Sequence, residues 1–279
     1  MSNKFIEFFK NIPSAKNDKC GEKELIKEIE NALTNQEFKM YLQFIVDNKT
    51  KKISSAEALS RWITYTGEVV FPGEYIGVME KSGLIIRFDY YMFEKVCSKL
   101  SEWKNTDLSD VMISCNFTRI TISEKDFLDK IKEIADKYDF DRTKLIIEIT
   151  EDSIEKNLVT AMLNIIKAKE LGFRIALDDI GSGYTSLVSL CEYPIDVVKI
   201  DREILLMAAT ERGEKLFWGI VSLAHYLNLK VVCEGVETEE QNKLVVESGC
   251  DYTQGWYYSK AMSEYNAEDF ARDYMAKLL

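Results

Sequence analysis

Short apolar runs alternate with amphipathic, helix-like segments along most of the chain. The apolar runs show little polar alternation, which is typical of parallel strands covered on both faces. Between them, residues 22–33 and 154–171 carry apolar side chains at helical spacing, and Gly172 suits the end of the second helix. Thr238 and Gln241 have the spacing of a capping box that opens a later helix. No Pro/Gly/Ser-rich linker interrupts the alternation, so the pattern predicts one α/β domain.

The first two strands depart from the parallel pattern. Residues 38–46 and 50–58 read as neighbouring strands joined by the turn at Asp47-Asn48-Lys49. Strands joined by so short a turn pair antiparallel. With about seven or eight strands in all, we predict a (β/α)8 barrel of the triosephosphate-isomerase type with an irregular, antiparallel first strand. An open doubly wound sheet is the alternative, but no Gly-rich phosphate turn follows the first strand.

Six of the apolar runs end in an acid, an amide or a lysine. A charge in a buried strand is costly unless it is paired, so these side chains are expected to converge where the strands end. In a barrel of parallel strands, that mouth is where catalytic groups lie. The residues at the six run ends are Glu57, Asn116, Glu148, Asp178 with Asp179, Lys199 and Glu234.

The oxygen atoms in this set suit a hard divalent cation such as magnesium, which prefers carboxylates, waters and substrate oxygens. Asp178 and Asp179 can reach the same site because the chain is already turning at the strand end. Two ions roughly 3.5–4 Å apart form the usual clamp for displacing an oxygen on phosphorus. Lys199 and Glu234 would then handle the water and its proton. Each residue taken singly is compatible with an ordinary loop acid or exposed segment, and only the joint pattern favours a site.

Composition narrows the function further. The 279 residues carry a net charge of -11, which opposes binding of a nucleic-acid polymer but not of a small anion screened by metal ions. No apolar stretch is long enough to span a membrane.

The sequence has six cysteines without a Cys-x-x-Cys pair, and no secretory signal. These features predict a cytoplasmic protein with reduced, mostly buried thiols. The single histidine, His225, excludes histidine-rich metal hydrolases and is expected to be an ordinary helix residue.

At Glu57-Ala58-Leu59 the chain resembles the EAL-domain cyclic-di-GMP phosphodiesterases, and the resemblance extends from about residue 37 to the end. A series of motifs follows the family's order, and together they are highly specific. The motifs are residues 41–46, 56–62, 114–118, 148–151, 176–187, 199–201, 234–238 and 254–257.

The resemblance implies hydrolysis of cyclic di-GMP to linear pGpG with Mg²⁺ or Mn²⁺, with Ca²⁺ expected to inhibit. It implies that Lys199 orients the attacking water, that Glu234 supports the second metal and the proton transfer, and that Glu151 braces the loop after Asp179. That loop would also form a homodimer contact. The implied metal ligands are Glu57, Asn116, Glu148, Asp178 and Asp179. The implied contacts to the dinucleotide are Gln43, Leu59, Arg61, Gly235, Glu237 and Gln254.

A few positions depart from the family's pattern, and none of them removes an oxygen ligand. Phe44, Gly77, Ile180, Ser182 and Ala261 stand where the family usually has other residues. The changes in the loop after Asp179 bear on its rigidity, on the dimer contact and on turnover.

We expect residues 37–279 to form the EAL-type barrel domain and residues 1–36 to form an N-terminal helical extension. Two other functions stay open. A catalytically weak or inactive module that binds cyclic di-GMP or a protein is one, although such relatives typically lose an acid and this chain has lost none. A barrel enzyme of the enolase kind is the other, and it would need a capping domain that the sequence does not show.

Overall fold

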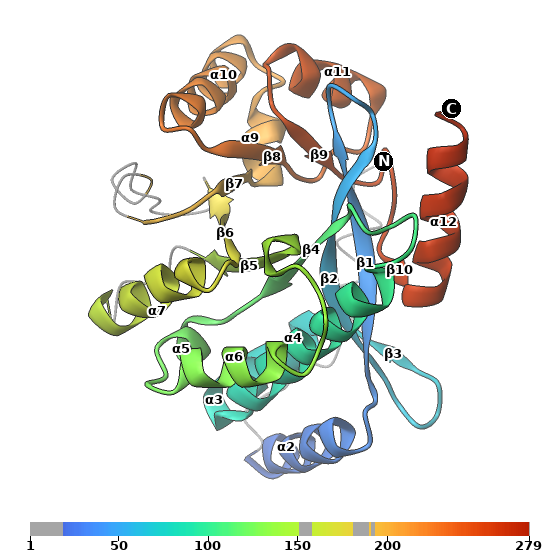
Figure 1. Ribbon diagram of the computed structural model, residues 1–279, viewed down its shortest axis with the longest axis vertical. Helices are drawn as coiled ribbons and strands as arrows, with labels where there is room; N and C mark the ends of the chain where they lie inside the picture. The colour runs from blue at the N-terminus through green and yellow to red at the C-terminus, as the bar shows by residue number, and fades with distance from the viewer. Residues whose placement is uncertain (1–18, 151–157, 181–189, 191–192, 279) are drawn as a thin grey trace.

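A closed barrel of eight strands forms the centre of the molecule (Figure 1). The computed structural model describes residues 19–150, 158–180, 190 and 193–278. The strand order is β1-β9-β8-β7-β6-β5-β4-β2, and pairing of β1 with β2 closes the ring. The predicted (β/α)8 barrel is therefore confirmed. The barrel strands are β1 (Phe38–Asp47), β2 (Ile53–Ile63), β4 (Met112–Asn116), β5 (Leu145–Thr150), β6 (Arg174–Ile180), β7 (Val197–Ile200), β8 (Lys230–Cys233) and β9 (Tyr252–Gln254).

The first strand runs against the rest of the barrel, as the short turn after it predicts. β1 pairs antiparallel with both β2 and β9, whereas every other neighbouring pair in the ring is parallel. The register sets Gln43 opposite Glu57 on one side and Ile45 opposite Gln254 on the other. Polar side chains of β1 and its two neighbours can therefore meet at one level of the barrel.

The second strand is longer than the sequence suggests. We expect it to end near Ala58, but it continues to Ile63. Its parallel ladder with β4 does stop at Ala58, and beyond that point it stays paired with β1 and with the short strand β3 (Val69–Val70). Glu57 thus lies inside a strand, close to the end of its parallel part.

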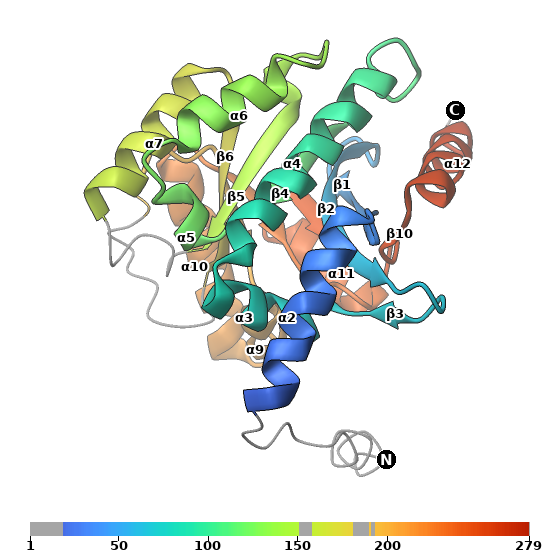
Figure 2. The same cartoon turned by 90° about the horizontal axis from the view of Figure 1, so that it is seen from below.

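Helices surround the barrel and cover its outer surface (Figures 1 and 2). The capping box at Thr238 is confirmed, because its hydroxyl accepts from the Gln241 amide at 3.3 Å and the Gln241 carboxamide accepts from the Thr238 amide at 3.1 Å. The described helices are α2 (Lys19–Thr34), α3 (Pro72–Ser82), α4 (Leu84–Trp103), α5 (Arg119–Ile122), α6 (Phe127–Ala135), α7 (Leu158–Glu170), α9 (Arg202–Met207), α10 (Glu211–Tyr226), α11 (Glu239–Glu247) and α12 (Glu264–Ala276).

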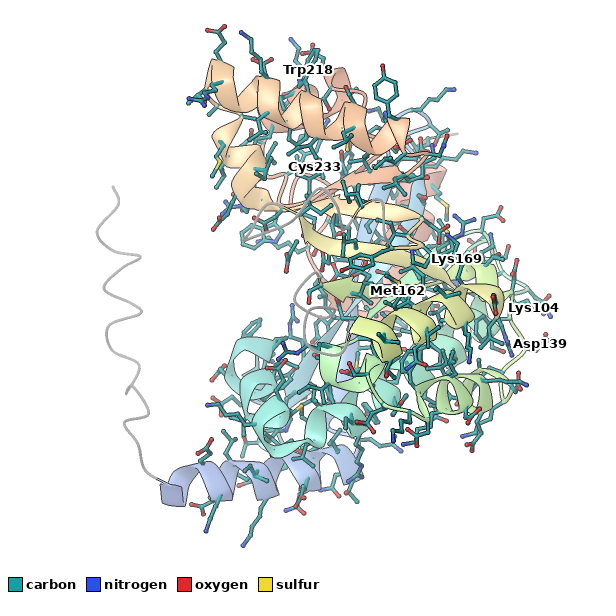
Figure 3. The ribbon with its side chains drawn as sticks, turned by 90° about the vertical axis from the view of Figure 1, so that its left-hand side faces the viewer. Lys104, Asp139, Met162, Lys169, Trp218 and Cys233 are labelled. Carbon is teal, nitrogen blue, oxygen red and sulfur yellow. The ribbon has the colours of Figure 1, made fainter. Side chains whose placement is uncertain are left out.

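The N-terminal helix packs onto the body of the molecule. α2 lies beside α3 (Figure 2), with Ile29, Ala32 and Leu33 buried in the main core. Elsewhere on the molecule, Met162 of α7 packs against the same core, whereas Trp218 of α10 is exposed; both residues are labelled in Figure 3. Among the described residues, none of the helices combines the length and apolar character needed to cross a bilayer.

The inside of the barrel is divided into an apolar lower part and a polar upper part. The lower part is a separate small cluster of buried aliphatic side chains. Directly above it, the same strands carry acids, amides and a lysine, because side chains two residues apart on a strand share a face. The acids and Lys199 therefore lie above this cluster, toward the mouth, whereas Arg174 and Lys230 lie at the lower end of the barrel. The lower cluster comprises Ile45, Ile146, Ala176, Val197 and Val232.

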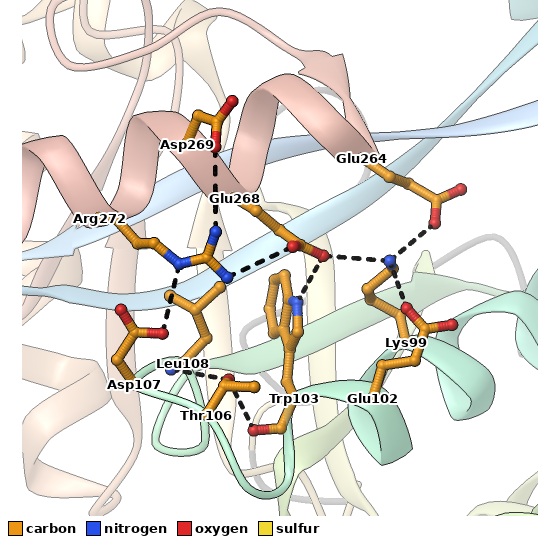
Figure 4. A network of polar contacts seen from close by, with 10 residues as sticks. All are labelled: Lys99, Glu102, Trp103, Thr106, Asp107, Leu108, Glu264, Glu268, Asp269 and Arg272. Atoms are coloured by element: carbon orange, nitrogen blue, oxygen red, sulfur yellow. Dashed lines mark hydrogen bonds and ion pairs between the residues drawn. The ribbon is translucent and has the colours of Figure 1, made fainter.

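The last helix, α12, is attached to α4 by a network of ion pairs (Figure 4). The buried Lys99 ammonium lies 2.7 Å from Glu102, 3.2 Å from Glu264 and 3.2 Å from Glu268. The Trp103 indole also donates to Glu268, at 3.1 Å. One lysine thus holds acids from both helices.

Replacing Lys99 by methionine is expected to lower the free energy of unfolding by about 1–2 kcal/mol, because it leaves partly buried acids without their cation. Urea denaturation measures this loss. As a control, Lys243 pairs with Glu247 only on the surface, at 3.8 Å. Lys243→Ala should change stability by less than about 0.5 kcal/mol. Equal losses in the two variants would mean that the buried network contributes no more than a surface pair.

Candidate active site

Lys199 occupies the centre of the barrel mouth, and only 2% of its side chain is exposed. Its ammonium group lies within ion-pair distance of four carboxylates, each from a different strand or strand end. The distances are 2.6 Å to Glu234, 3.0 Å to Glu148, 3.3 Å to Asp178 and 3.4 Å to Glu57. The structure therefore brings together five residues that the sequence places far apart.

Three amide side chains extend this cluster around Glu57. The Asn116 amide donates to one Glu57 oxygen at 2.9 Å, and the Gln254 amide donates to the other at 2.6 Å. Gln254 also donates to the Gln43 oxygen, at 3.4 Å. Each of the eight barrel strands thus contributes one polar side chain, from the strand or just after it, to a single connected network.

Burial and mutual repulsion control the charges in this network. Burial alone would raise the pKa of Glu57, but the Lys199 charge and the bonds from Gln254 and Asn116 outweigh it, so its pKa is lowered. The pKa of Glu148 is raised well above its usual range by burial and by its acidic neighbours, against the attraction of Lys199. Burial, opposed by Lys199 and reinforced by neighbouring acids, raises the pKa of Glu234 to about 8.

Asp179 adds a further acid at the end of β6. Burial and the adjacent Asp178 carboxylate raise its pKa to about 6. Its backbone has the left-handed φ of 60°, where the register of β6 against β7 shifts. This turn lets two consecutive side chains serve one site, as the sequence suggested. Oxygen atoms of Asp178, Asp179 and Glu234 lie within 4.8 Å of one another.

These residues fit a divalent cation. The cluster offers carboxylate and amide oxygens and no sulfur or imidazole nitrogen, which matches the preference of Mg²⁺ and Mn²⁺. The single charge of Lys199 cannot balance five carboxylates, so added positive charge would relieve their repulsion. The buried carboxamide oxygen of Gln254 has no hydrogen-bond partner among the described residues, and is free to accept from a bound water.

Most of the predicted dinucleotide contacts line two cavities on either side of Leu59. One cavity, of about 420 Å³, also contains Glu57 and Glu234. The other, of about 500 Å³, is bounded by Leu59, Asn116 and residues of α3, α4 and α5. Of the six predicted contact residues, Gln43, Leu59, Gly235, Glu237 and Gln254 line the first cavity.

Arg61, the sixth residue of that set, lines neither of these two cavities. Its guanidinium lies over the rings of Tyr41, at 5.5 Å, and Phe71, at 5.0 Å, and donates to the Ser60 carbonyl at 2.7 Å. Because β2 continues past Glu57, Arg61 stays in the hairpin with β1.

Three residues that line the first cavity were not predicted, namely Arg202, Gly255 and Trp256. Arg202 pairs with Glu237 at 2.9 Å, and its side chain lies across Gly235, where an added Cβ would come within 2.5 Å of it. Gly235 also has a φ of 66°, so both backbone and space require glycine there. Trp256 stands at the rim with 61% of its surface exposed. The signals were a basic residue three positions after Lys199 and an aromatic residue two after Gln254.

Two predictions concern residues outside the described part of the chain. One is the bracing role of Glu151, and the other is the role of the loop after Asp179, which includes residues 181–189. The homodimer contact predicted for that loop stays a prediction. The sequence also predicted reduced, mostly buried cysteines. Among the described residues, this is confirmed for Cys97, Cys115, Cys233 and Cys250, which are free and buried.

One family model matches this chain. The EAL domain model covers residues 26–261, and the chain belongs to the EAL domain family. It is 32% identical over 256 residues to the Signaling protein YkoW of Bacillus subtilis, covering 90% of this chain and 32% of that protein. It is 27% identical over 254 residues to the Cyclic di-GMP phosphodiesterase NbdA of Pseudomonas aeruginosa, covering 91% of this chain and 32% of that protein.

Solved structures show the same likeness. The PaMucR phosphodiesterase in its c-di-GMP complex superposes with a TM-score of 0.82 at 26% identity, covering 88% of this chain and 99% of that one. The chain spans about a third of the length of the curated relatives described above.

Proposed function

We propose that this protein is a divalent-metal-dependent phosphodiesterase that opens cyclic di-GMP to linear pGpG. The observation that carries the proposal is the network at the mouth, in which Lys199 contacts four acids while a fifth, Asp179, lies beside them. The solved relative that holds c-di-GMP supports the choice of substrate.

Mg²⁺ or Mn²⁺ would be held by Glu57, Asn116, Glu148, Asp178 and Asp179. Bound divalent cations supply two things to such a reaction, namely polarisation of a phosphoryl oxygen and a water of lowered pKa. The site as a whole thus combines a cation-binding set with the groups that handle water.

The other polar groups divide the handling of water between them. Burial would lower the pKa of Lys199, but the surrounding acids hold it well above its usual range, so the ammonium stays charged. It can therefore donate hydrogen bonds and orient a water, but it cannot take a proton. Glu234 is the most exposed of the four acids around Lys199, at 20% of its side chain, and is the group placed to accept one.

The dinucleotide would lie across Leu59 with one base in each cavity. Gln43, Gly235, Glu237 and Gln254 would contact it from the cavity of about 420 Å³. Arg61 would leave its position over Tyr41 and Phe71 to pair with a phosphate, which a guanidinium can bind through two parallel hydrogen bonds. Glu151 would brace the loop after Asp179, and a homodimer through that loop belongs to the same proposal.

The direct test is chromatography of cyclic di-GMP after incubation with the protein. Linear pGpG is expected with Mg²⁺ or Mn²⁺, and none with Ca²⁺ or a chelator. Absence of product with both Mg²⁺ and Mn²⁺ would refute the proposal. Tight binding of cyclic di-GMP that stays unhydrolysed for hours would favour an inactive binding module instead.

Added Mg²⁺ is expected to raise the melting temperature, and to do so more at pH 8.5 than at pH 6. Without metal, the folded state keeps protons on Glu234 and Asp179 at pH values where the unfolded chain has lost them. The stability contributed by these raised pKa values therefore falls as the pH rises from about 4 to about 8. A cation must displace the same protons, so it binds better at high pH.

The expected shift at pH 8.5 is on the order of 5 °C at saturating Mg²⁺, falling to about 1–2 °C at pH 6. Differential scanning fluorimetry measures both values. A shift of equal size at the two pH values would contradict the assignment of these acids to the cation site.

A further inference from the structure

Asp89 is a buried acid that the Lys199 network does not include. It lies on α4 with only 3% of its surface exposed. Within the described part of the chain, no lysine or arginine comes within ion-pair distance of it. An isolated carboxylate in the interior is costly unless hydrogen bonds replace its water. Its partners therefore indicate what it does.

Among the described residues, the three hydrogen bonds to Asp89 come from the turn that follows β4. One carboxylate oxygen accepts from the Thr118 backbone amide at 2.9 Å, from the Thr118 hydroxyl at 2.7 Å and from the Thr121 hydroxyl at 2.6 Å. Burial raises the pKa of Asp89 to about 6, against the effect of these bonds, so the group is ionised at neutral pH and can accept all three. A helix 29 residues earlier thus anchors the turn.

The bonds within the turn join only its own residues: the Thr118 and Thr121 hydroxyls lie 3.2 Å apart, and the Ile122 amide donates to the Thr118 carbonyl at 3.1 Å. The Phe117 amide donates to the Glu148 carbonyl at 3.0 Å, and after this bond the chain leaves the sheet. α5 has only four residues, and its N-cap residue, Thr118, makes no side-chain capping bond. The Thr118 hydroxyl is turned to Asp89 instead. The direction in which the chain leaves β4 therefore depends on α4.

Asn116 is the residue whose position this turn controls. It is the last residue of β4, two positions before Thr118, and its side chain is exposed rather than packed. Its amide nevertheless donates to Glu57 at 2.9 Å. Since packing does not confine it, the backbone that carries it must.

We infer that Asp89 is a positioning residue that fixes the turn after β4 so that Asn116 is presented to Glu57 and to the cation site. The inference rests on the proposed function for the role of the cations, but it concerns the affinity of the site for metal, not the reaction. Groups that orient a metal ligand typically change metal affinity 10–100-fold when they are replaced.

Asp89→Asn removes the charge and keeps the size, while Thr121→Val removes one of the three donors and leaves the acid. The control is Asn164 of α7, which is also buried and donates to the carbonyls of Ile122, at 2.7 Å, and Glu124, at 2.9 Å. It anchors the far end of the same segment. Asn164→Ala should therefore lower stability without moving Asn116.

Titration calorimetry with Mn²⁺ alone, without dinucleotide, is the deciding measurement, with the melting temperature recorded for each variant. We expect Asp89→Asn to weaken Mn²⁺ binding about tenfold, Thr121→Val to weaken it less, and Asn164→Ala to change it by less than about twofold. If Asp89→Asn fails to fold, Thr121→Val decides the question alone.

Unchanged Mn²⁺ affinity in the Asp89 and Thr121 variants would overturn the inference. If the KM for cyclic di-GMP rose while Mn²⁺ affinity stayed the same, Asp89 would be a substrate contact in the cavity of about 500 Å³ that it also lines. A wild-type protein that binds Mn²⁺ but makes no pGpG would refute the proposed function and leave this inference standing. Wild type that binds no Mn²⁺ would refute both.

Discussion

Replacing Glu57 by alanine is expected to reduce hydrolysis of cyclic di-GMP by about 10³-fold or more. Glu57 accepts from Asn116 and Gln254 and lies 3.4 Å from Lys199. Its removal therefore takes away a proposed metal ligand and also releases both amides that it holds. Initial rates of pGpG formation at saturating Mg²⁺ measure the effect.

Glu211 provides the matched control for this experiment. It is an exposed acid on α10 that pairs with Lys215 at 2.6 Å. Glu211→Ala should leave the rate unchanged, because surface pairs contribute little and Glu211 lines neither of the two cavities at the mouth. Near-native activity in Glu57→Ala would show that Glu57 is not a ligand of the first metal.

Replacing Lys199 by alanine should have two separable effects. The rate should fall by about 10²–10⁴-fold, as for loss of a group that orients the reacting water and its proton. The metal-free protein should also lose about 3–5 kcal/mol of stability, because four acids around a buried position lose their partner. Added Mg²⁺ should restore part of this stability, since cations can replace the missing charge.

Steady-state kinetics, Mn²⁺ titration and urea denaturation together test the second prediction. The Mn²⁺ affinity should change far less than the rate. Lys230→Ala is the control, because Lys230 pairs with Asp251 at 2.7 Å at the start of β8, the opposite end of that strand from Glu234. Equal losses of rate and of metal affinity in Lys199→Ala would make Lys199 a structural residue.

The convergence at the mouth was predictable from the sequence because parallel strands all end at the same rim. An acid, amide or lysine at the end of an apolar run could thus be assigned to that rim without knowing any side-chain contact. This reasoning placed Glu148, Asp178, Lys199 and Glu234 correctly relative to one another. It held even for Glu57, although its strand continues beyond it.

The features that could not be predicted from the sequence are those that depend on tertiary contacts. Asp89 reads as a charge interrupting the apolar run 84–93, and nothing local shows that Thr118 and Thr121 will face it. The orientation of Arg61 onto Tyr41 follows from the length of β2, which depends on pairing partners rather than on its own residues. Arg202 lies across Gly235 because two strand ends are adjacent in the barrel.

Anomalous scattering from crystals grown with Mn²⁺ would test most directly whether the acids at the mouth form a cation site. We expect strong peaks next to the Lys199 ammonium, among the oxygens of Glu57, Asn116, Glu148, Asp178 and Asp179. Peaks only at surface acids, or an empty mouth at saturating Mn²⁺, would contradict it.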